Sequence, residues 1–457
     1  MNIKKHLSQT PLLIFFLAVV AVIESVWILK SNGFYYIDEL AHYLYSRFVL
    51  QALPLTVQTW HRPIPQWLFA LPAQLGHTFT MFFAAGLFIG LLLVTYRIAL
   101  LHRIKHAEWI IILVGLQPVL FDLSYACMTE VPAAWMIMVS YFYHLKGRYG
   151  WSLVLASLVI LCRTEMFLYA GLMFLIYAYK REWKILPLIV VGPILWVVST
   201  TLISGDIMTF FKEWTHFTHL GKFVPGVSLT HHFENLHTTF GYAQVILLIA
   251  GVIVIAKAKR SAEFGILYAA IAMTIIFHTI AGAEIFHWTG SIGELRYLTV
   301  VGPFVGIVSV YGMSEILDRL KSSAIRFAFS ITVFSVVVFN CTIAIHPRVW
   351  ATYNKIVIEM TKELMKTHPD MTVLCNNPSV AYMMDESPAG GMHYQLFNKE
   401  TLKKYPECII LWDPFSSISI YYQTEVTKEM VLRDTTIKVL EKYNYWSAEY
   451  LLLYKHK

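Results

Sequence analysis

The chain is poor in charged residues and has few cysteines, and these shortages exclude several classes of protein. Only 14% of its 457 residues are charged, against about a quarter in an ordinary soluble domain, and 57% are hydrophobic. Its five cysteines are scattered without a CxxC pair, which argues against a metal site or a disulfide framework. A single Cys375–Cys408 bridge is left open. The composition predicts an integral membrane protein.

Several short enzyme motifs are also missing. The sequence has no glycine-rich phosphate loop, Walker pattern, nucleophile elbow or HExxH pair. A cytoplasmic nucleotide-sugar site therefore has no support, and donor sugars outside the cytoplasm are normally carried on lipid phosphate. Before His346 there are 23 Lys/Arg against 16 Asp/Glu, and from His346 onward 13 of each. This placement of the excess charge points to membrane topology and lipid contact, so we expect no nucleic-acid partner.

Long apolar runs fill the first three quarters of the chain. Crossing a bilayer takes about 20 apolar residues, or fewer for a span buried in a bundle. We expect about eleven spans, near 11–29, 79–101, 108–121, 130–146, 150–162, 164–179, 184–203, 240–256, 262–281, 297–316 and 325–345. A further apolar piece at 63–76 is interrupted by prolines, which fits an interfacial or partial helix.

The loop charges predict the orientation of these spans. Alternate loops, beginning with Lys4 and Lys5, carry 16 basic residues, and the intervening loops carry seven. The positive-inside rule places the first set, and the N-terminus, in the cytoplasm. Ten carboxylates then fall on the outer side. With an odd number of spans, residues 346–457 also lie outside the cytoplasm.

The last 112 residues (346–457) differ from the rest, because charge rises and long apolar runs end. The pieces 371–377, 408–413 and 450–454 fit short strands, and 423–443 fits a helix. We therefore expect a transmembrane domain over 1–345 and a small extracytoplasmic α/β domain over 346–457.

Residues 33–47, GFYYIDELAHYLYSR, place two adjacent acids in the first outer loop. Glycosyl transfer needs a carboxylate to accept the proton of the attacking hydroxyl, and Asp38 is our candidate, with Glu39 beside it. Neighbours on a helix point about 100° apart, so the two acids cannot share one direction. The alternative is that both are ordinary solvated loop acids.

Three further outer motifs carry paired charges. TEVP at 129–132 places Glu130 at the start of a span, either in a site or as part of a helix cap. CRTEM at 162–166 places Arg163 and Glu165 at the tip of a helical hairpin, either as a phosphate ligand or as a local pair. GELRYL at 293–298 places Glu294, Arg296 and Tyr297 before a late span, where charges are costly unless they are paired in a cavity.

The long loop 204–239 begins with Asp206 and contains five histidines, including His216. Their spacings form no tight ligand pattern, so we expect no required metal or other cofactor, with a divalent metal kept as the alternative. Histidines that lie at the membrane interface or contact lipid phosphate fit this loop better.

Together these motifs resemble the GT-C superfamily of polytopic glycosyltransferases, and more narrowly bacterial relatives of the dolichyl-phosphate-mannose mannosyltransferases. The similarity covers nearly the whole membrane part, on the acidic first loop, TEVP, CRTEM, GDIMTFFKEW at 205–214 and GELRYL. It implies a mainly α GT-C fold and an inverting transfer of a sugar from a polyprenyl-phosphate donor. Mannose is one candidate sugar, although Ser291–Ile292–Gly293 stand where the mannosyltransferase pattern has a His-Lys pair.

The resemblance also implies roles for individual residues. Asp38 would be the base beside Glu39, and three residues would bind the lipid phosphate: Arg163, Arg296 and His216. Five residues would support the cavity: Glu130, Glu165, Asp206, Glu294 and Tyr297. The acceptor would be a glycan, a lipid or a protein, in the assembly of a cell-envelope glycan at the plasma (inner) membrane.

Two other functions fit parts of the sequence. A lipid-diphosphate glycan polymerase or ligase would rely on outer-loop arginines more than on a first-loop acid. A membrane transporter would show paired repeats with broken helices near the bilayer midplane, and the sequence has no such internal symmetry.

Overall fold

A computed structural model gives the structure of the protein and describes residues 3–51, 53–57, 60, 62–217, 227–283, 293–414, 416, 426–445 and 448–456. It divides into two compact units. The first unit comprises Met1–Lys30, Val57–Pro65 and Gly76–Pro347. The second comprises Ser31–Thr56, Gln66–Leu75 and Arg348–Lys457. The second unit thus joins two short segments near the N-terminus to the last part of the chain.

The first unit consists of helices, most of them apolar. Its α-helices are α1 (Ile3–Lys30), α4 (His77–Leu101), α5 (Trp109–Gly115), α6 (Pro118–Ser124), α7 (Glu130–Leu145), α8 (Tyr149–Leu158), α9 (Phe167–Tyr179), α10 (Val191–Ser204), α11 (Met208–Phe217), α12 (His231–Glu234), α13 (Leu236–Phe240), α14 (Tyr242–Lys257), α15 (Gly265–Gly282), α16 (Gly302–Arg319) and α17 (Ser323–Ala344). Its 3₁₀ segments are η2 (Val159–Leu161), η3 (Thr164–Met166), η4 (Trp183–Val190) and η6 (Leu295–Val301), and η1 (Leu53–Val57) lies at the border of the units.

Each of the eleven predicted apolar runs coincides with one or two of these helices. Among the described residues, six helices are long and apolar enough to cross a membrane: Pro11–Lys30, His77–Leu101, Trp183–Ser204, Gly265–Gly282, Leu295–Arg319 and Ser323–Ala344. Three shorter apolar helices, Tyr149–Leu161, Thr164–Tyr179 and Tyr242–Lys257, accompany them. The predicted multi-pass helical bundle is confirmed, and the count of eleven spans stays a prediction.

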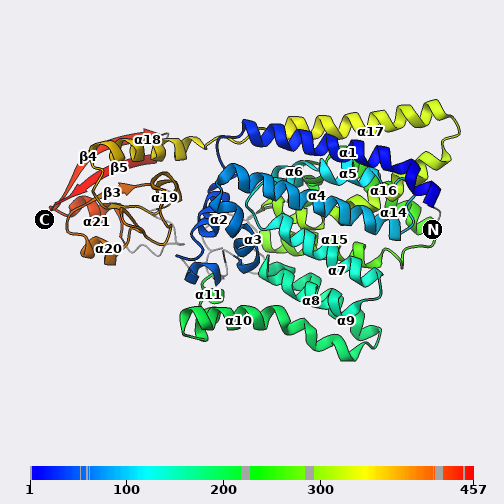
Figure 1. Ribbon diagram of the computed structural model, residues 1–457, viewed down its shortest axis with the longest axis horizontal. Helices are drawn as coiled ribbons and strands as arrows, with labels where there is room; N and C mark the ends of the chain where they lie inside the picture. The colour runs from blue at the N-terminus through cyan, green and yellow to red at the C-terminus, as the bar shows by residue number, and fades with distance from the viewer. Residues whose placement is uncertain are drawn as a thin grey trace. The chain divides into compact units, whose positions relative to one another are not determined.

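The core of the first unit surrounds the segment Leu295–Arg319. In the most apolar stretch of this segment, 89% of the residues are buried. Its helix α16 packs closely on α14, because Gly251 and Gly312 let the two backbones approach. Small residues serve this purpose at helix contacts in membranes. At another contact α1 and α17 lie side by side, with the rings of Phe16 and Phe334 stacked 6.2 Å apart (Figure 1). The core segment η6–α16 begins with Arg296 and Tyr297, so a rigid element carries these two side chains.

The second unit contains a five-stranded sheet in the order β2-β1-β3-β5-β4. Its strands are β1 (Val373–Leu374), β2 (Tyr394–Gln395), β3 (Cys408–Trp412), β4 (Ile437–Tyr445) and β5 (Ala448–Lys455). Strands β2, β1 and β3 are parallel, whereas β5 is antiparallel to β3 and β4. Its helices are α2 (Ile37–Arg47), α18 (Thr352–Thr367), α19 (Pro378–Met384), α20 (Lys399–Lys404) and α21 (Lys428–Arg433), and α3 (Pro63–Gln74) begins in the first unit and continues in the second.

The α/β character of the C-terminal part is confirmed, with one error of detail. The three expected strands are present as β1, β3 and β5, but the helix expected over 423–443 is wrong for most of its length. Residues Ile437–Tyr445 form β4, since Ile437, Val439 and the tyrosines favour a strand and β5 offers an antiparallel partner. Cys375 and Cys408 are free buried thiols, so the bridge between them is absent.

Candidate functional site

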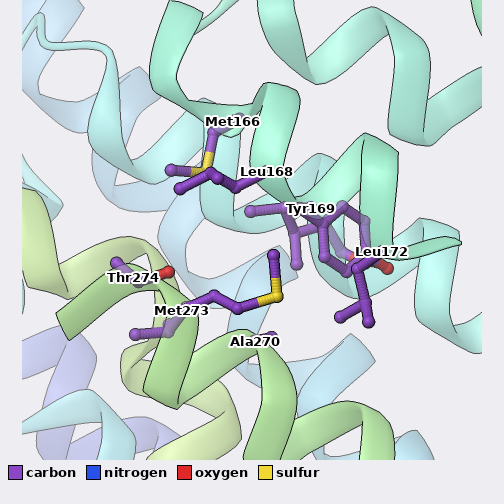
Figure 2. Close-up of a pocket in the computed structure, with 9 residues that line it drawn as sticks. Met166, Leu168, Tyr169, Leu172, Ala270, Met273 and Thr274 are labelled. Carbon is purple, nitrogen blue, oxygen red and sulfur yellow. The ribbon is translucent and has the colours of Figure 1, made fainter. Parts of the chain in front are cut away.

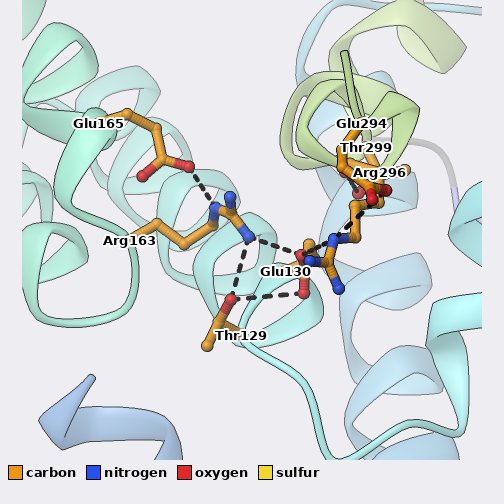
Figure 3. A network of polar contacts seen from close by, with 7 residues as sticks. All are labelled: Thr129, Glu130, Arg163, Glu165, Glu294, Arg296 and Thr299. Atoms are coloured by element: carbon orange, nitrogen blue, oxygen red, sulfur yellow. Dashed lines mark hydrogen bonds and ion pairs between the residues drawn. The ribbon is translucent and has the colours of Figure 1, made fainter. Parts of the chain in front are cut away.

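Charged side chains from three distant parts of the first unit meet around Glu130. Glu130 is the first residue of α7, where the positive end of the helix dipole favours a carboxylate. Arg163 lies between η2 and η3 at the hairpin tip, and Arg296 lies in η6. All three are buried, with exposed fractions of 1%, 7% and 8%. The residues that Figure 3 draws around them are called the arginine–carboxylate network below.

Arg163 is the most tightly held member of this network. Its Nη1 donates to Glu130 Oε1 at 2.6 Å and to the Thr129 hydroxyl at 3.0 Å, and its Nε donates to Glu165 Oε1 at 2.5 Å (Figure 3). The Thr129 side chain makes no cap on α7. The Thr129 hydroxyl instead lies between the guanidinium group and Glu130. The TEVP motif therefore supplies two side chains to the network in addition to starting α7.

The ion pairs of Arg296 with Glu130 and Glu294 are longer than those that Arg163 makes. Nε of Arg296 lies 3.8 Å from Glu130 Oε1 and 3.8 Å from Glu294 Oε2. The ring of Tyr297 supports both guanidinium groups, with Arg163 Cζ 4.5 Å and Arg296 Cζ 5.4 Å from the ring centroid. Both distances allow a cation–π contact. Because guanidinium groups bind phosphate oxygens well, the longer ion pairs of Arg296 suit a group that exchanges a carboxylate for a ligand.

Arg62 is a third arginine at this place, and the sequence reasoning missed it. It interacts electrostatically with Glu165, Arg163 and Tyr297, and burial lowers its pKa to about 10, which leaves it charged at neutral pH. Its φ of 65° lies in the left-handed region, directly before Pro63. Such backbone strain is concentrated at functional sites. In the sequence, Arg62 is distinguished only by its place in an outer loop directly before a proline. This feature is too weak to single out one loop arginine as part of a site.

In the described part of the chain, arginines and carboxylates alternate at this site. Three guanidinium groups, of Arg62, Arg163 and Arg296, stand near the carboxylates of Glu130, Glu165 and Glu294. Burial alone would lower the pKa of Arg163, but the adjacent carboxylates of Glu165 and Glu130 raise it. The arginines are therefore fixed cations, arranged to meet an anionic group such as a phosphate.

Asp206 has other partners than this network in the described part of the chain. Asp206 is exposed, accepts from the backbone N–H of Met208 at the start of α11, and pairs with Lys212 at 2.9 Å. His216 belongs to α11, but its side chain lies outside the described part of the chain. Their expected roles stay predictions.

Asp38 and Glu39 lie on α2 in the second unit, in different surroundings. Glu39 is fully buried and pairs with Arg348, whereas Asp38 is half-buried. Tyr353 has its pKa raised by burial and then by the carboxylates of Asp413 and Asp38, which makes it a neighbour of Asp38. These different environments agree with the expectation that neighbouring residues on a helix point in different directions.

A small pocket in the first unit is apolar and separate from the charged groups. It lies between α7, α9, α15 and η6, and Figure 2 shows Tyr169, Leu172, Met273 and Thr274 around it. No charged side chain lines it. A phosphate would find no counter-charge there, so the site rests on the arginine–carboxylate network.

Comparison with solved structures finds the same fold. The crystal structure of ArnT from Cupriavidus metallidurans in the apo state matches with a TM-score of 0.65 and 11% identity, covering 97% of this chain and 98% of that one. The structure of the same protein bound to undecaprenyl phosphate matches with a TM-score of 0.62 and 10% identity, covering 96% and 97%. At this identity the likeness shows a shared fold, and the expected mainly α bundle with a small C-terminal α/β part is confirmed. No protein-family model and no curated protein matches the sequence.

Proposed function

We propose that the protein is an integral membrane glycosyltransferase that takes a sugar from a polyprenyl-phosphate donor. The observation that carries this proposal is the gathering of Arg62, Arg163 and Arg296 around buried Glu130, on a fold shared with a protein crystallised with undecaprenyl phosphate. Fixed guanidinium groups are suited to a lipid phosphate, both in the bound donor and as the leaving group.

In the proposed reaction an acceptor hydroxyl attacks the anomeric carbon of the donor sugar. Its proton passes to the carboxylate of Asp38, the new C–O bond forms, and the bond between the sugar and the phosphate breaks. The electron pair leaves with the polyprenyl phosphate, whose charge the arginines stabilise. Attack opposite to the leaving group inverts the anomeric centre. The acceptor side is the extracytoplasmic face, as the loop charges predict.

The test uses the purified full-length protein in lipid vesicles with radiolabelled undecaprenyl-phosphate sugars, mannose among them. Membranes from a deletion strain supply glycan, lipid and protein acceptors. We expect transfer of label, and a loss of about 10²-fold or more in Asp38→Asn, the range for removing a general base. Asp318→Asn is the matched control, because Asp318 pairs with Lys105 near the end of α16, at the opposite end of the η6–α16 segment from Arg296.

Two results would contradict the proposal in different ways. Full activity in Asp38→Asn would reject Asp38 as the base while leaving the transferase intact. Absence of transfer from every lipid-phosphate sugar would reject the function itself.

A lipid-diphosphate glycan polymerase or ligase is the second candidate. The presence of three guanidinium groups at one site favours it, since a diphosphate carries more negative charge than a monophosphate. Parallel assays with diphosphate-linked and monophosphate-linked donors separate the two functions. The second candidate also predicts that Arg163→Ala reduces activity more than Asp38→Asn.

A further inference from the structure

Two histidines of the first unit are buried without using their ring nitrogens. His232 on α12 is fully buried and His278 on α15 is 2% exposed. Among the described residues, none of their four ring nitrogens has a hydrogen-bond partner. Buried polar groups in folded proteins are nearly always hydrogen-bonded, so a pair of such exceptions points to a missing ligand.

The two rings lie together and next to the arginine–carboxylate network. Their centroids are 6.5 Å apart, and the His278 ring lies 5.2 Å from the ring of Tyr297. His278 also interacts electrostatically with Glu165 and Arg163. The unused nitrogens are therefore neighbours of the groups to which a phosphate is assigned above.

The chemistry of the pair favours a hydroxylated ligand. Among the described residues, no group of three His, Cys, Asp or Glu side chains is placed to hold a metal ion. Burial lowers the pKa of His232 to about 4, which keeps the ring neutral. A neutral imidazole has one donor and one acceptor, the complement of a hydroxyl group, whereas phosphate oxygens only accept.

We propose that His232 and His278 bind hydroxyl groups of the sugar carried by the lipid phosphate. This inference rests on the proposed function and adds a sugar-binding subsite to it. The arginines hold the phosphate, and the histidine pair recognises the adjacent sugar. A site built to bond hydroxyl groups rejects sugars that lack them, so the pair also determines which sugars are accepted.

The test compares two probes on the full-length protein in lipid nanodiscs. One probe is undecaprenyl phosphate, and the other is the same lipid bearing mannose, glucose or galactose. In His278→Phe and His232→Phe, which keep an aromatic ring but lose the nitrogens, we expect the affinity for the sugar-bearing lipid to fall about tenfold, as for one lost hydrogen bond. The affinity for undecaprenyl phosphate should stay within about twofold of the wild type.

Two further variants make the result specific. His278→Asn retains a donor and an acceptor and should recover part of the lost affinity, and it serves if His278→Phe does not fold. His237→Phe is the matched control, since His237 already stacks on Tyr242 and should bind both probes normally.

The outcomes distinguish this inference from the proposed function. Unchanged affinity for the sugar-bearing lipid in the histidine variants, or an equal loss for both probes, would overturn the sugar subsite and leave the function standing. A wild-type protein that binds neither probe would overturn the proposed function and the subsite with it.

Discussion

Glu39 and Arg348, 309 positions apart in the sequence, form a buried ion pair in the second unit. Nη1 of Arg348 lies 2.9 Å from each carboxylate oxygen of Glu39, and the two side chains are 3% and 0% exposed. The backbone N–H of Tyr35 also donates to Glu39. This pair fastens the first outer loop to the segment that follows the last helix of the first unit.

Close packing near this ion pair also joins the first outer loop to the segment that contains Arg348. A Cβ atom at Gly33 would collide with the backbone of Val349 and Trp350, so glycine is required there. Phe34 packs edge-on against the rings of Trp350 and Tyr382. The aromatic ring of Phe34 is thus explained by packing, and Asp38 stands on α2, the helix that the Glu39–Arg348 pair anchors.

Breaking the Glu39–Arg348 pair should destabilise the second unit. Removing one partner of a buried pair leaves an uncompensated charge and costs about 3–5 kcal/mol, so Arg348→Ala should lower the unfolding temperature strongly. The measurement is thermal unfolding of the full-length protein in detergent. Asp385→Asn is the control, because Asp385 is 67% exposed in its pair with Arg47 and such pairs contribute about 0–1 kcal/mol. Similar unfolding temperatures for the two variants would contradict a structural role for Arg348.

Substitutions of the two adjacent acids should affect different properties, activity for Asp38 and stability for Glu39. Asp38→Asn should reduce transfer without a change in the unfolding temperature, because Asp38 is half-buried and is assigned to the reaction. Glu39→Gln should lower the unfolding temperature, because it removes the carboxylate that Arg348 contacts. The measurement pairs initial rates with thermal unfolding for each variant. A strongly destabilised Asp38→Asn would argue that this acid also serves packing.

The sequence predicts the helices well because their cause is local. An apolar run long enough to cross a membrane forms a helix because its backbone N–H and C=O groups must pair within the segment, and each predicted run coincides with observed helices. The loop charges likewise predict that Glu130, Arg163 and Arg296 lie on the same side of the membrane. The structure brings these three residues together. The helix expected over 423–443 is wrong at β4, because this segment pairs with β5, the next strand along the chain, and the pattern of one segment alone does not reveal that pairing.

The sequence does not predict contacts between residues that are far apart along the chain. No local pattern links Glu39 to Arg348, since the two residues meet only through tertiary packing. His278 stands within an apolar run, where its burial and unused nitrogens become visible only in three dimensions. A polar residue inside a membrane segment is nevertheless a signal of function, and it could have singled out His278.

Arg163 and Arg296 should differ in what they contribute. Arg163→Gln removes contacts of 2.5 to 3.0 Å to three side chains and should lower both the unfolding temperature and the affinity for undecaprenyl phosphate. Arg296→Gln removes a guanidinium group whose ion pairs with Glu130 and Glu294 span 3.8 Å, and it should reduce lipid-phosphate affinity by about tenfold or more. Binding titrations and thermal unfolding on both variants provide the check. Unaltered affinity in Arg296→Gln would remove this residue from the phosphate site.

Acid should destabilise the protein through His232. Burial lowers its folded-state pKa to about 4 from 6.5, so below pH 6.5 the unfolded chain binds a proton that the folded chain excludes. Stability therefore falls as the pH drops from 6.5 to about 4, by up to roughly 3 kcal/mol from this group. Unfolding measured across this pH range should show a shallower decline in His232→Gln. Parallel curves for wild type and variant would show that His232 is not buried as a neutral ring.

The orientation of the second unit can be tested by labelling cysteines in intact cells. The loop charges place residues 346–457 outside the cytoplasm and the loop at Lys321 inside it. All five native cysteines are buried, which keeps background labelling low. A cysteine at exposed Glu400 on α20 should react with a membrane-impermeant maleimide on whole cells, whereas Lys321→Cys should react only after lysis. The reverse pattern would invert the topology and would place the proposed transfer on the cytoplasmic face, where a lipid-phosphate donor has no advantage over a nucleotide sugar.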